Sequence, residues 1–334
     1  MEDKNSLFRS ARRSFSVIGF AFAVLIAVVY LTQLAFVLIP QRLGWDGLTE
    51  QPWWTWVFLS APMYLFAFPA CCLMLRMLPG DKPEGKKLTV KQFLALIPIC
   101  FCLMYGGNLL GTFLSWFLSD GNAVNALDSY AMDTSPLKIL VMVILAPLLE
   151  ELICRKLLID RTVRYGEKIS VLMSGLIFGL LHQNLYQFFY AFALGSLFGY
   201  VYVRTGRVRY TIILHTMINF LGAVVAPALV SMLNTDTMIA LMSETGNVTP
   251  EAMMEVAPVL LLVFGYSMAI LGLSIGGLVL LILKCRKLTW KETTYQLPGK
   301  LALKASFLNV GMIVYILICL IMIILAVMNF KIKI

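Results

Sequence analysis

The chain contains two histidines, and both lie inside long apolar runs. His182 ends the segment Phe178-Gly-Leu-Leu-His182, and His215 begins the segment His215-Thr-Met-Ile-Asn219. An ionisable side chain in the middle of a membrane costs about 2.5–3.5 kcal/mol on insertion scales, so it usually has a partner and a function. A single membrane histidine is more often a hydrogen-bonding residue between helices. The functional interpretation therefore depends on several polar clusters occurring together.

A third cluster, Glu150-Glu151-Leu-Ile-Cys-Arg155, lies in another apolar run. Glu151 and Arg155 are four residues apart, so they share a helix face and are expected to form a supporting ion pair. Glu150 is rotated by about 100° around the helix and has no such local partner. Glu150 is therefore the candidate catalytic carboxylate.

Together these groups suit the hydrolysis of an amide bond. A carboxylate and an imidazole that share a water molecule make it nucleophilic by general-base catalysis. A second imidazole and a carboxamide can donate hydrogen bonds to the oxyanion that forms as the water attacks. The predicted catalytic residues are Glu150, His182, His215 and Asn219, and the predicted supporting residues are Glu151, Arg155 and Phe178.

Zinc is the alternative way to activate the water. Glu150, His182 and His215 supply the three protein ligands of a catalytic zinc site, which leaves a fourth position for water. The chain has no HExxH segment, the strongest local signature of such a site. Water activation without a metal is therefore the preferred expectation, with Zn²⁺ kept as the alternative cofactor.

The composition predicts the fold class. Of 334 residues, 60% are hydrophobic and 13% are charged, and that charged share is about half of what soluble domains carry. Several apolar runs exceed the ~18 residues that mark a membrane-spanning helix. We therefore predict an all-α polytopic membrane protein, and the net charge of +9 is interpreted as membrane topology rather than as nucleic-acid binding.

The apolar runs predict about nine spans. They cover residues 14–39, 53–75, 92–118, 136–158, 169–185, 187–203, 210–233, 257–283 and 307–330. With the amino terminus in the cytosol, all of the 27 Lys and Arg residues except Arg42, Lys138, Lys331 and Lys333 fall on the cytosolic side or near it. This bias follows the positive-inside rule, and the expected location is a bacterial plasma membrane.

Two of the runs, 169–185 and 187–203, are short and are joined by the polar link His182-Gln183-Asn184. Both contain a pair of glycines four residues apart, which lets helix backbones approach closely. We expect these two helices to lie inside the bundle. Counted from the cytosolic helix ends, Glu150 and His182 lie at similar depths of roughly 20 Å, whereas His215 lies at roughly 8 Å.

The ordered motifs EExxxR at Glu150, FxxxH at Phe178 and HxxxN at His215 resemble the CPBP intramembrane proteases. These are the type II CAAX prenyl endopeptidases and their bacterial relatives, including the Abi and bacteriocin self-immunity proteins. The resemblance implies helices around a conical cavity, with the attacking water on Glu150 and His182. It also implies an oxyanion site at His215 and Asn219.

The resemblance divides the chain into three parts. Residues 1–135 form an amino-terminal three-helix membrane region, residues 136–226 the catalytic core, and residues 227–334 carboxy-terminal membrane helices with an acidic outer loop at 234–256. The expected partners are the lipid bilayer and a peptide or lipidated-protein substrate. The predicted function is cleavage of that peptide within the membrane. A non-catalytic membrane scaffold or bacteriocin-immunity factor is the main alternative, and a proton-coupled transporter is a weaker one.

Overall fold

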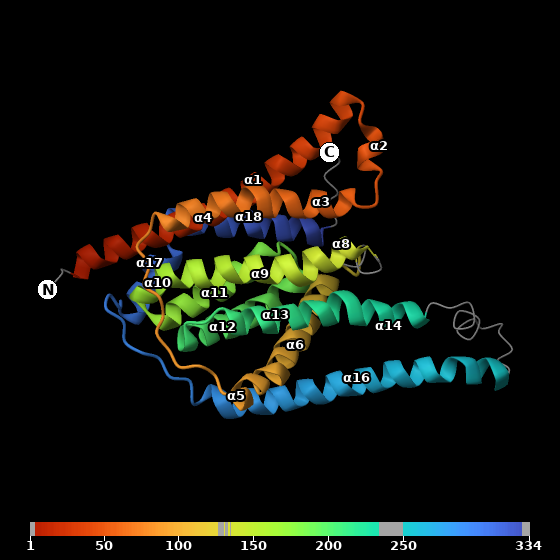
Figure 1. Ribbon diagram of the computed structural model, residues 1–334. Helices are drawn as coiled ribbons and strands as arrows, with labels where there is room; N and C mark the ends of the chain where they lie inside the picture. Colours follow the sequence, from red (N-terminus) through yellow and green to blue (C-terminus); the bar gives the residue numbers. More distant parts are fainter. Residues whose placement is uncertain (1–3, 126–129, 131–132, 134, 234–249, 329–334) are drawn as a thin grey trace.

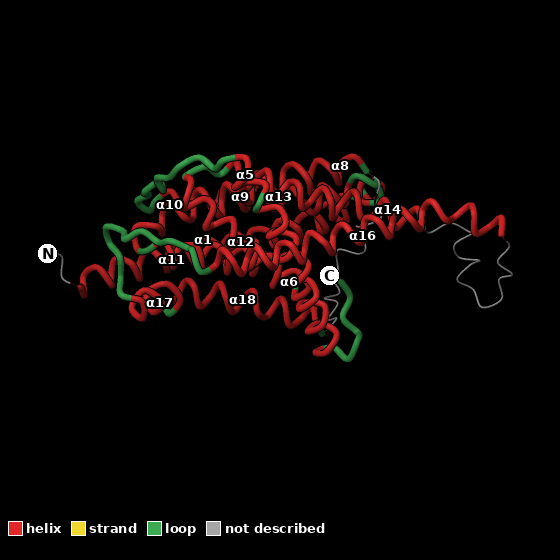
Figure 2. The backbone as a smooth tube through the Cα atoms, turned by 90° about the horizontal axis from the view of Figure 1, so that it is seen from below, coloured by secondary structure: helices red, strands yellow, loops and turns green. Residues whose placement is uncertain are grey.

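Inside a bilayer the backbone has to satisfy its own hydrogen bonds, and this chain does so with helices. The computed structural model describes residues 4–125, 130, 133, 135–233 and 250–328, and all regular structure in those residues is helical (Figures 1 and 2). The predicted all-α fold is thereby confirmed. Most of the predicted acidic outer loop, residues 234–249, lies outside the described residues.

The amino-terminal helices precede the segment that carries the predicted catalytic residues. They are α1 (Lys4–Leu43), α2 (Asp46–Thr49), α3 (Trp54–Ala61), η1 (Pro62–Ala67), α4 (Phe68–Arg76), α5 (Val90–Leu94) and α6 (Leu96–Leu118). The central helices begin at Pro136. They are α8 (Pro136–Lys138), η2 (Ile139–Leu145), α9 (Ala146–Glu151), η3 (Leu152–Leu157), α10 (Leu158–Thr162), η4 (Val163–Tyr165), α11 (Glu167–Leu181), α12 (Leu185–Thr205), α13 (Arg209–Phe220), η5 (Leu221–Val225) and α14 (Ala226–Leu233). The carboxy-terminal helices are α16 (Pro250–Cys285), α17 (Gly299–Phe307) and α18 (Val310–Val327).

The central helices are covered on two sides. Figure 1 shows α1, α4 and α18 on one side of α9, α11, α12 and α13, with α6 and α16 on the other. The largest cluster of buried apolar side chains joins α1, α4, α11 and α18. Where α1 meets α18, a Cβ added to Gly19 would collide with the backbone of Gly311, so these two helices touch through their glycines.

Six helical segments of the described chain are long and apolar enough to cross a membrane. They are Lys4–Leu43, Trp54–Arg76, Val90–Leu118, Arg209–Leu233, Val256–Cys285 and Val310–Val327. The other three predicted spans correspond to the continuous helix from α8 to η4 and to α11 and α12. The protein is thus a multi-pass membrane protein, while the count of nine stays a prediction.

The helix α11 has the predicted interior position. It is 15 residues long, and 11 of its residues, from Glu167 to Leu180, are buried. Its glycines allow close contact with α12, because a Cβ on Gly195 would lie 3.1 Å from the Cα of Gly175. The predicted link His182-Gln183-Asn184 is confirmed as the connection between α11 and α12.

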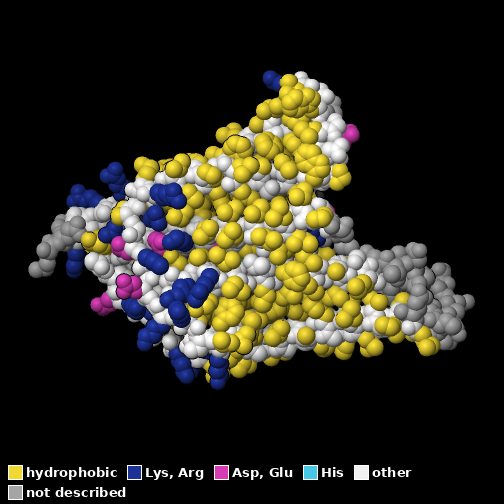
Figure 3. All heavy atoms as spheres, in the orientation of Figure 1, with side chains coloured by type: hydrophobic (Ala, Val, Ile, Leu, Met, Phe, Trp, Pro, Cys, Tyr) yellow, Lys and Arg dark blue, Asp and Glu magenta, His cyan; other side chains and the backbone are white. Residues whose placement is uncertain are grey.

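Charged side chains gather at one end of the molecule. Figure 3 shows the Lys and Arg side chains on its visible face concentrated at the end where α1 begins. The middle of that face is apolar, as expected for a surface in contact with lipid tails. The orientation of this end toward the cytosol stays a prediction, as does the division of the chain at residues 135 and 226.

Three spans contain a wide π-type turn that ends two residues before a proline. The turns are η1 before Pro69, η2 before Pro147 and η5 before Pro227. In each case the residue before the proline donates its N–H to the carbonyl five residues back. Proline has no N–H and its ring displaces the carbonyl four residues earlier, so the local helix widens.

Candidate active site

The two neighbouring glutamates at the end of α9 have different surroundings. Glu151 is fully buried, and its Oε1 lies 3.0 Å from Nη2 of the fully buried Arg155, which confirms the predicted ion pair. The Arg155 guanidinium also lies 4.4 Å from the centroid of the Phe178 ring. The side chain of Glu150 is 21% exposed. Glu151 is therefore held in the protein interior, whereas Glu150 is accessible.

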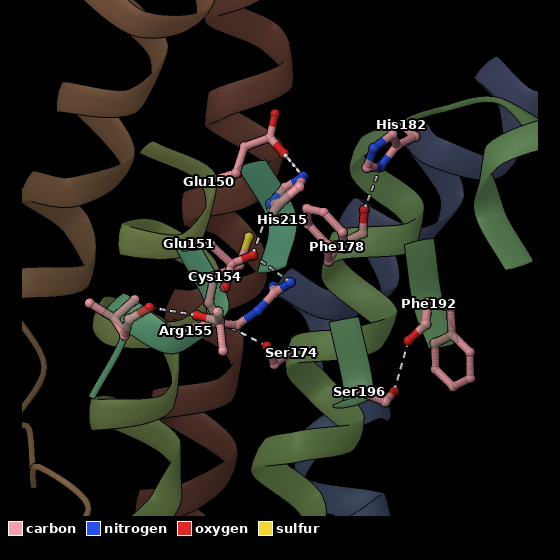
Figure 4. A network of polar contacts seen from close by, with 12 residues as sticks. Glu150, Glu151, Cys154, Arg155, Ser174, Phe178, His182, Phe192, Ser196 and His215 are labelled. Atoms are coloured by element: carbon pink, nitrogen blue, oxygen red, sulfur yellow. Dashed lines mark hydrogen bonds and ion pairs between the residues drawn. The ribbon is translucent and has the colours of Figure 1, made fainter. Parts of the chain in front are cut away.

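His215 lies between the two glutamates, as Figure 4 shows. Its Nδ1 is 3.1 Å from Oε1 of Glu151, and its Nε2 is 3.9 Å from Oε2 of Glu150. The difference in depth estimated from the sequence is therefore absent in the structure. That estimate assumed that all helices begin at one level, whereas α13 brings His215 beside the end of α9.

The pairing of Glu151 with Arg155 identifies the donor in the contact with His215. An ionised carboxylate only accepts hydrogen bonds, so Nδ1 of His215 carries the proton. The Nε2 atom then faces Glu150. The hydrogen bond from Nδ1 to Glu151 thus fixes the orientation and the tautomer of the His215 ring.

His182 lies at the carboxy-terminal end of α11, in the link to α12. Its Nδ1 is 2.8 Å from the backbone oxygen of Phe178. Because a carbonyl oxygen cannot donate, Nδ1 is the protonated nitrogen, and Nε2 of the neutral ring is an acceptor. Within the described residues, Glu150 forms its ion-pair contact with His215 and none with His182, so a water shared by Glu150 and His182 stays a prediction.

Phe178 occupies the space between the two imidazoles. Its ring meets His182 and His215 edge to face, with centroids 5.0 Å and 5.5 Å apart. This apolar ring separates the histidines and covers the buried Arg155 guanidinium.

Asn219 is held by a carbonyl that the helix leaves without its usual backbone donor. Its Nδ2 donates to the backbone oxygen of Met142 at 2.7 Å. The N–H of Ala146 bonds to Val141 instead, and Pro147 has no N–H to offer. Asn219 keeps its second Nδ2 hydrogen for another acceptor.

All four predicted catalytic residues line one cavity of about 540 Å³. They reach it from three helices: Glu150 from α9, His182 from the end of α11, and His215 and Asn219 from successive turns of α13. The remaining wall is mainly apolar, with Asn108, Lys138 and Gln187 among its polar residues. This cavity is a concave, mostly apolar pocket with a few convergent polar groups, the usual form of a small binding site.

Sequence reasoning missed the roles of Pro147 and Lys138. Pro147 positions the acceptor of Asn219, and the signal for it was a proline three residues before Glu150 in a helical run. Lys138 was counted as an outer charge. It is instead buried against the cavity, where its Nζ donates to the backbone oxygen of Asp133 at 3.0 Å.

Comparison with known proteins identifies the central part of the chain. Residues 133–221 match the family described as Rce1-like, type II CAAX prenyl endopeptidase Rce1-like. A protein of Bacillus subtilis (strain 168) named "Putative membrane peptidase YdiL" is 36% identical over 169 residues, which cover 46% of this chain and 67% of that protein. The chain belongs to the Rce1-like endopeptidase family. No solved structure matches it.

The Rce1-like match runs from the loop before α8 into η5. It therefore contains the four cavity residues Glu150, His182, His215 and Asn219, together with Glu151, Arg155 and Phe178. The helices α1, α16 and α18 lie outside the matched segment, although α1 and α18 pack against the core that it forms.

The alternative zinc site was tested against the side chains of this Rce1-like core. Within the described residues, no group of three or more His, Cys, Asp or Glu side chains is arranged to hold one metal ion. Glu150, His182 and His215 share a cavity but are not gathered as three ligands in this conformation. The donor set does not fit zinc in this arrangement.

Proposed function

We propose that the protein is an intramembrane endopeptidase that hydrolyses a peptide bond in a membrane-associated or lipidated peptide. Membership of an endopeptidase family supports a membrane protease. The observation that carries the proposal is the cavity in which Glu150, His182, His215 and Asn219 meet. Water reaches a peptide bond inside a membrane only where polar side chains such as these line a cavity.

The proposed nucleophile is a water molecule held by Glu150 and His182. The carboxylate of Glu150 and Nε2 of His182 are both acceptors, so each takes one hydrogen of the water and its oxygen lone pair remains for attack. Glu150 takes the proton as the oxygen bonds to the carbonyl carbon, in the manner of a general base. When the tetrahedral intermediate collapses, the C–N bond breaks and the leaving amine receives that proton.

The proposed oxyanion site consists of His215 and Asn219. The second Nδ2 hydrogen of Asn219 is one donor. His215 is the other donor when its Nε2, which faces Glu150, carries a proton. Donors that are already oriented toward the developing charge stabilise it without reorganisation.

The test is cleavage in proteoliposomes. A panel of quenched fluorescent peptides, with and without a lipid anchor, is incubated with the wild type and with Glu150→Gln. We expect a loss of activity of at least about a hundredfold, since general-base catalysis contributes that much. Equal cleavage by both proteins would remove Glu150 from the reaction.

The metal question has a separate test. We expect that extensive chelation leaves the cleavage rate unchanged, because the proposed steps use protein side chains. Activity that disappears on chelation and returns with zinc alone would replace this mechanism by zinc activation of the water.

A further inference from the structure

The catalytic cavity adjoins a second chamber that the proposed mechanism does not use. This chamber has a volume of about 560 Å³ and lies between α1, α18 and the link from α11 to α12. It shares Met63, Tyr130, Leu181, His182 and Gln187 with the catalytic cavity. His182 therefore borders both spaces, and the chamber lies directly beside the predicted catalytic residues.

The chamber has an apolar side and a polar side. The apolar side consists of α1 and α18 residues such as Leu25, Val29 and Met322. The polar side carries carboxamides, among them Gln33, Gln183 and Gln187. A wholly apolar chamber would suit a lipid chain, and the carboxamides instead suit a ligand with its own donors and acceptors.

A peptide in this protein needs hydrogen bonds from side chains. Proteins often bind an extended peptide by adding it to the edge of a sheet, but the regular structure in the described residues is helical. Helix backbones already use their polar groups internally. Unpaired peptide groups are costly to bury, so carboxamide side chains are the available partners.

The existing contacts leave complementary groups free. Oε1 of Gln183 accepts from the Tyr30 hydroxyl at 2.6 Å, so the amide hydrogens of Gln183 can face a carbonyl. Nε2 of Gln187 donates to the Tyr190 hydroxyl at 2.8 Å, and its Oε1 accepts from Nδ2 of Asn184 at 3.4 Å. The second lone pair of that oxygen can still accept from an N–H. Gln183 also has a φ of 49°, a backbone conformation that is rare for a residue other than glycine and that often occurs at functional sites.

We propose that this chamber binds the part of the peptide substrate next to the scissile bond, with its backbone paired to Gln33, Gln183 and Gln187. The inference rests on the proposed endopeptidase function and specifies its substrate class. The substrate is an apolar peptide that extends several residues beyond the cleaved bond. Its apolar side chains contact α1 and α18, helices that lie outside the family match.

The experiment uses the fluorescent peptide that is cleaved fastest in the proteoliposome assay, together with versions shortened from each end. Gln33→Leu removes one hydrogen bond, and Gln41→Leu makes the same change on the same helix outside the chamber. We expect Gln33→Leu to raise KM for the full peptide roughly two- to tenfold, with kcat unchanged. For the peptide shortened from the end that occupies the chamber, Gln33→Leu and the wild type should have equal KM. Gln41→Leu should match the wild type throughout.

A second variant fills the chamber instead of removing a hydrogen bond. Ala326→Trp places a large ring in it, whereas Ile324→Trp changes a residue that is 54% exposed on the same helix and does not line it. We expect Ala326→Trp alone to raise KM for the full peptide. If both chamber variants match the wild type at every peptide length while Glu150→Gln is inactive, the chamber proposal is wrong and the protease remains. If the wild type cleaves no peptide of the panel, the proposed function itself is wrong.

Discussion

The helices α11 and α16 are both predominantly apolar, yet they occupy opposite environments. Eleven of the 15 residues of α11 are buried in protein, whereas only 6% of the most apolar window of α16 is buried. The side chains of α16 that point outward are mainly Leu, Phe, Ile and Met, and α11 ends at His182. The apolar composition of both helices thus shows only that they avoid water. The polar residue at the end of α11 indicates that protein, rather than lipid, surrounds that helix.

The sharpest way to test this difference is to remove a buried charge beside α11. Glu151→Ala takes away the partner of both Arg155 and His215. Breaking a buried pair costs about 3–5 kcal/mol, so we expect a large fall in the thermal midpoint in detergent and loss of cleavage. A midpoint equal to that of the wild type would show that the pair is not important for stability.

A glycine substitution in each helix compares the two environments directly. In Gly175→Ala the new Cβ would collide with Oγ of Ser196, whereas at Gly272 of α16 the space is open. Overpacking costs about 1–3 kcal/mol, while alanine gains up to ~1 kcal/mol over glycine in a helix. We expect lower thermal stability for Gly175→Ala and equal or higher stability for Gly272→Ala. The reverse order would contradict the interior position of α11.

A smaller effect is expected from Pro147→Ala, which concerns the helix opposite α11 in the cavity. The new N–H can bond to the Met142 carbonyl and compete with Asn219. We expect kcat to fall about tenfold, which corresponds to about 1.4 kcal/mol, with little change in stability.

A double-mutant cycle tests whether Pro147 affects kcat through Asn219. If Pro147 acts through Asn219, then Pro147→Ala should have no further effect on kcat in an Asn219→Ala background. Additive losses in the double variant would mean that Pro147 affects the site by another route.

The spacing of residues along the sequence predicted contacts within one helix. It did not predict how the helices are placed relative to one another. The Glu151–Arg155 pair is set by four-residue spacing within one helix, and the link after His182 is marked by polar residues between two apolar runs. The position of His215 depends on where α13 begins relative to α9, which no periodicity within either helix encodes. The burial of Lys138 depends in the same way on tertiary packing, because its sequence neighbours resemble those of an exposed helix end.

The three wide turns that precede prolines have a mechanical consequence. Met63 of η1, Met142 of η2 and Gly222 of η5 all line the catalytic cavity. At each turn one rung of the helical ladder is already missing, so bending there breaks no additional hydrogen bond. The cavity wall therefore contains three positions at which its helices can bend at the lowest cost in backbone hydrogen bonds.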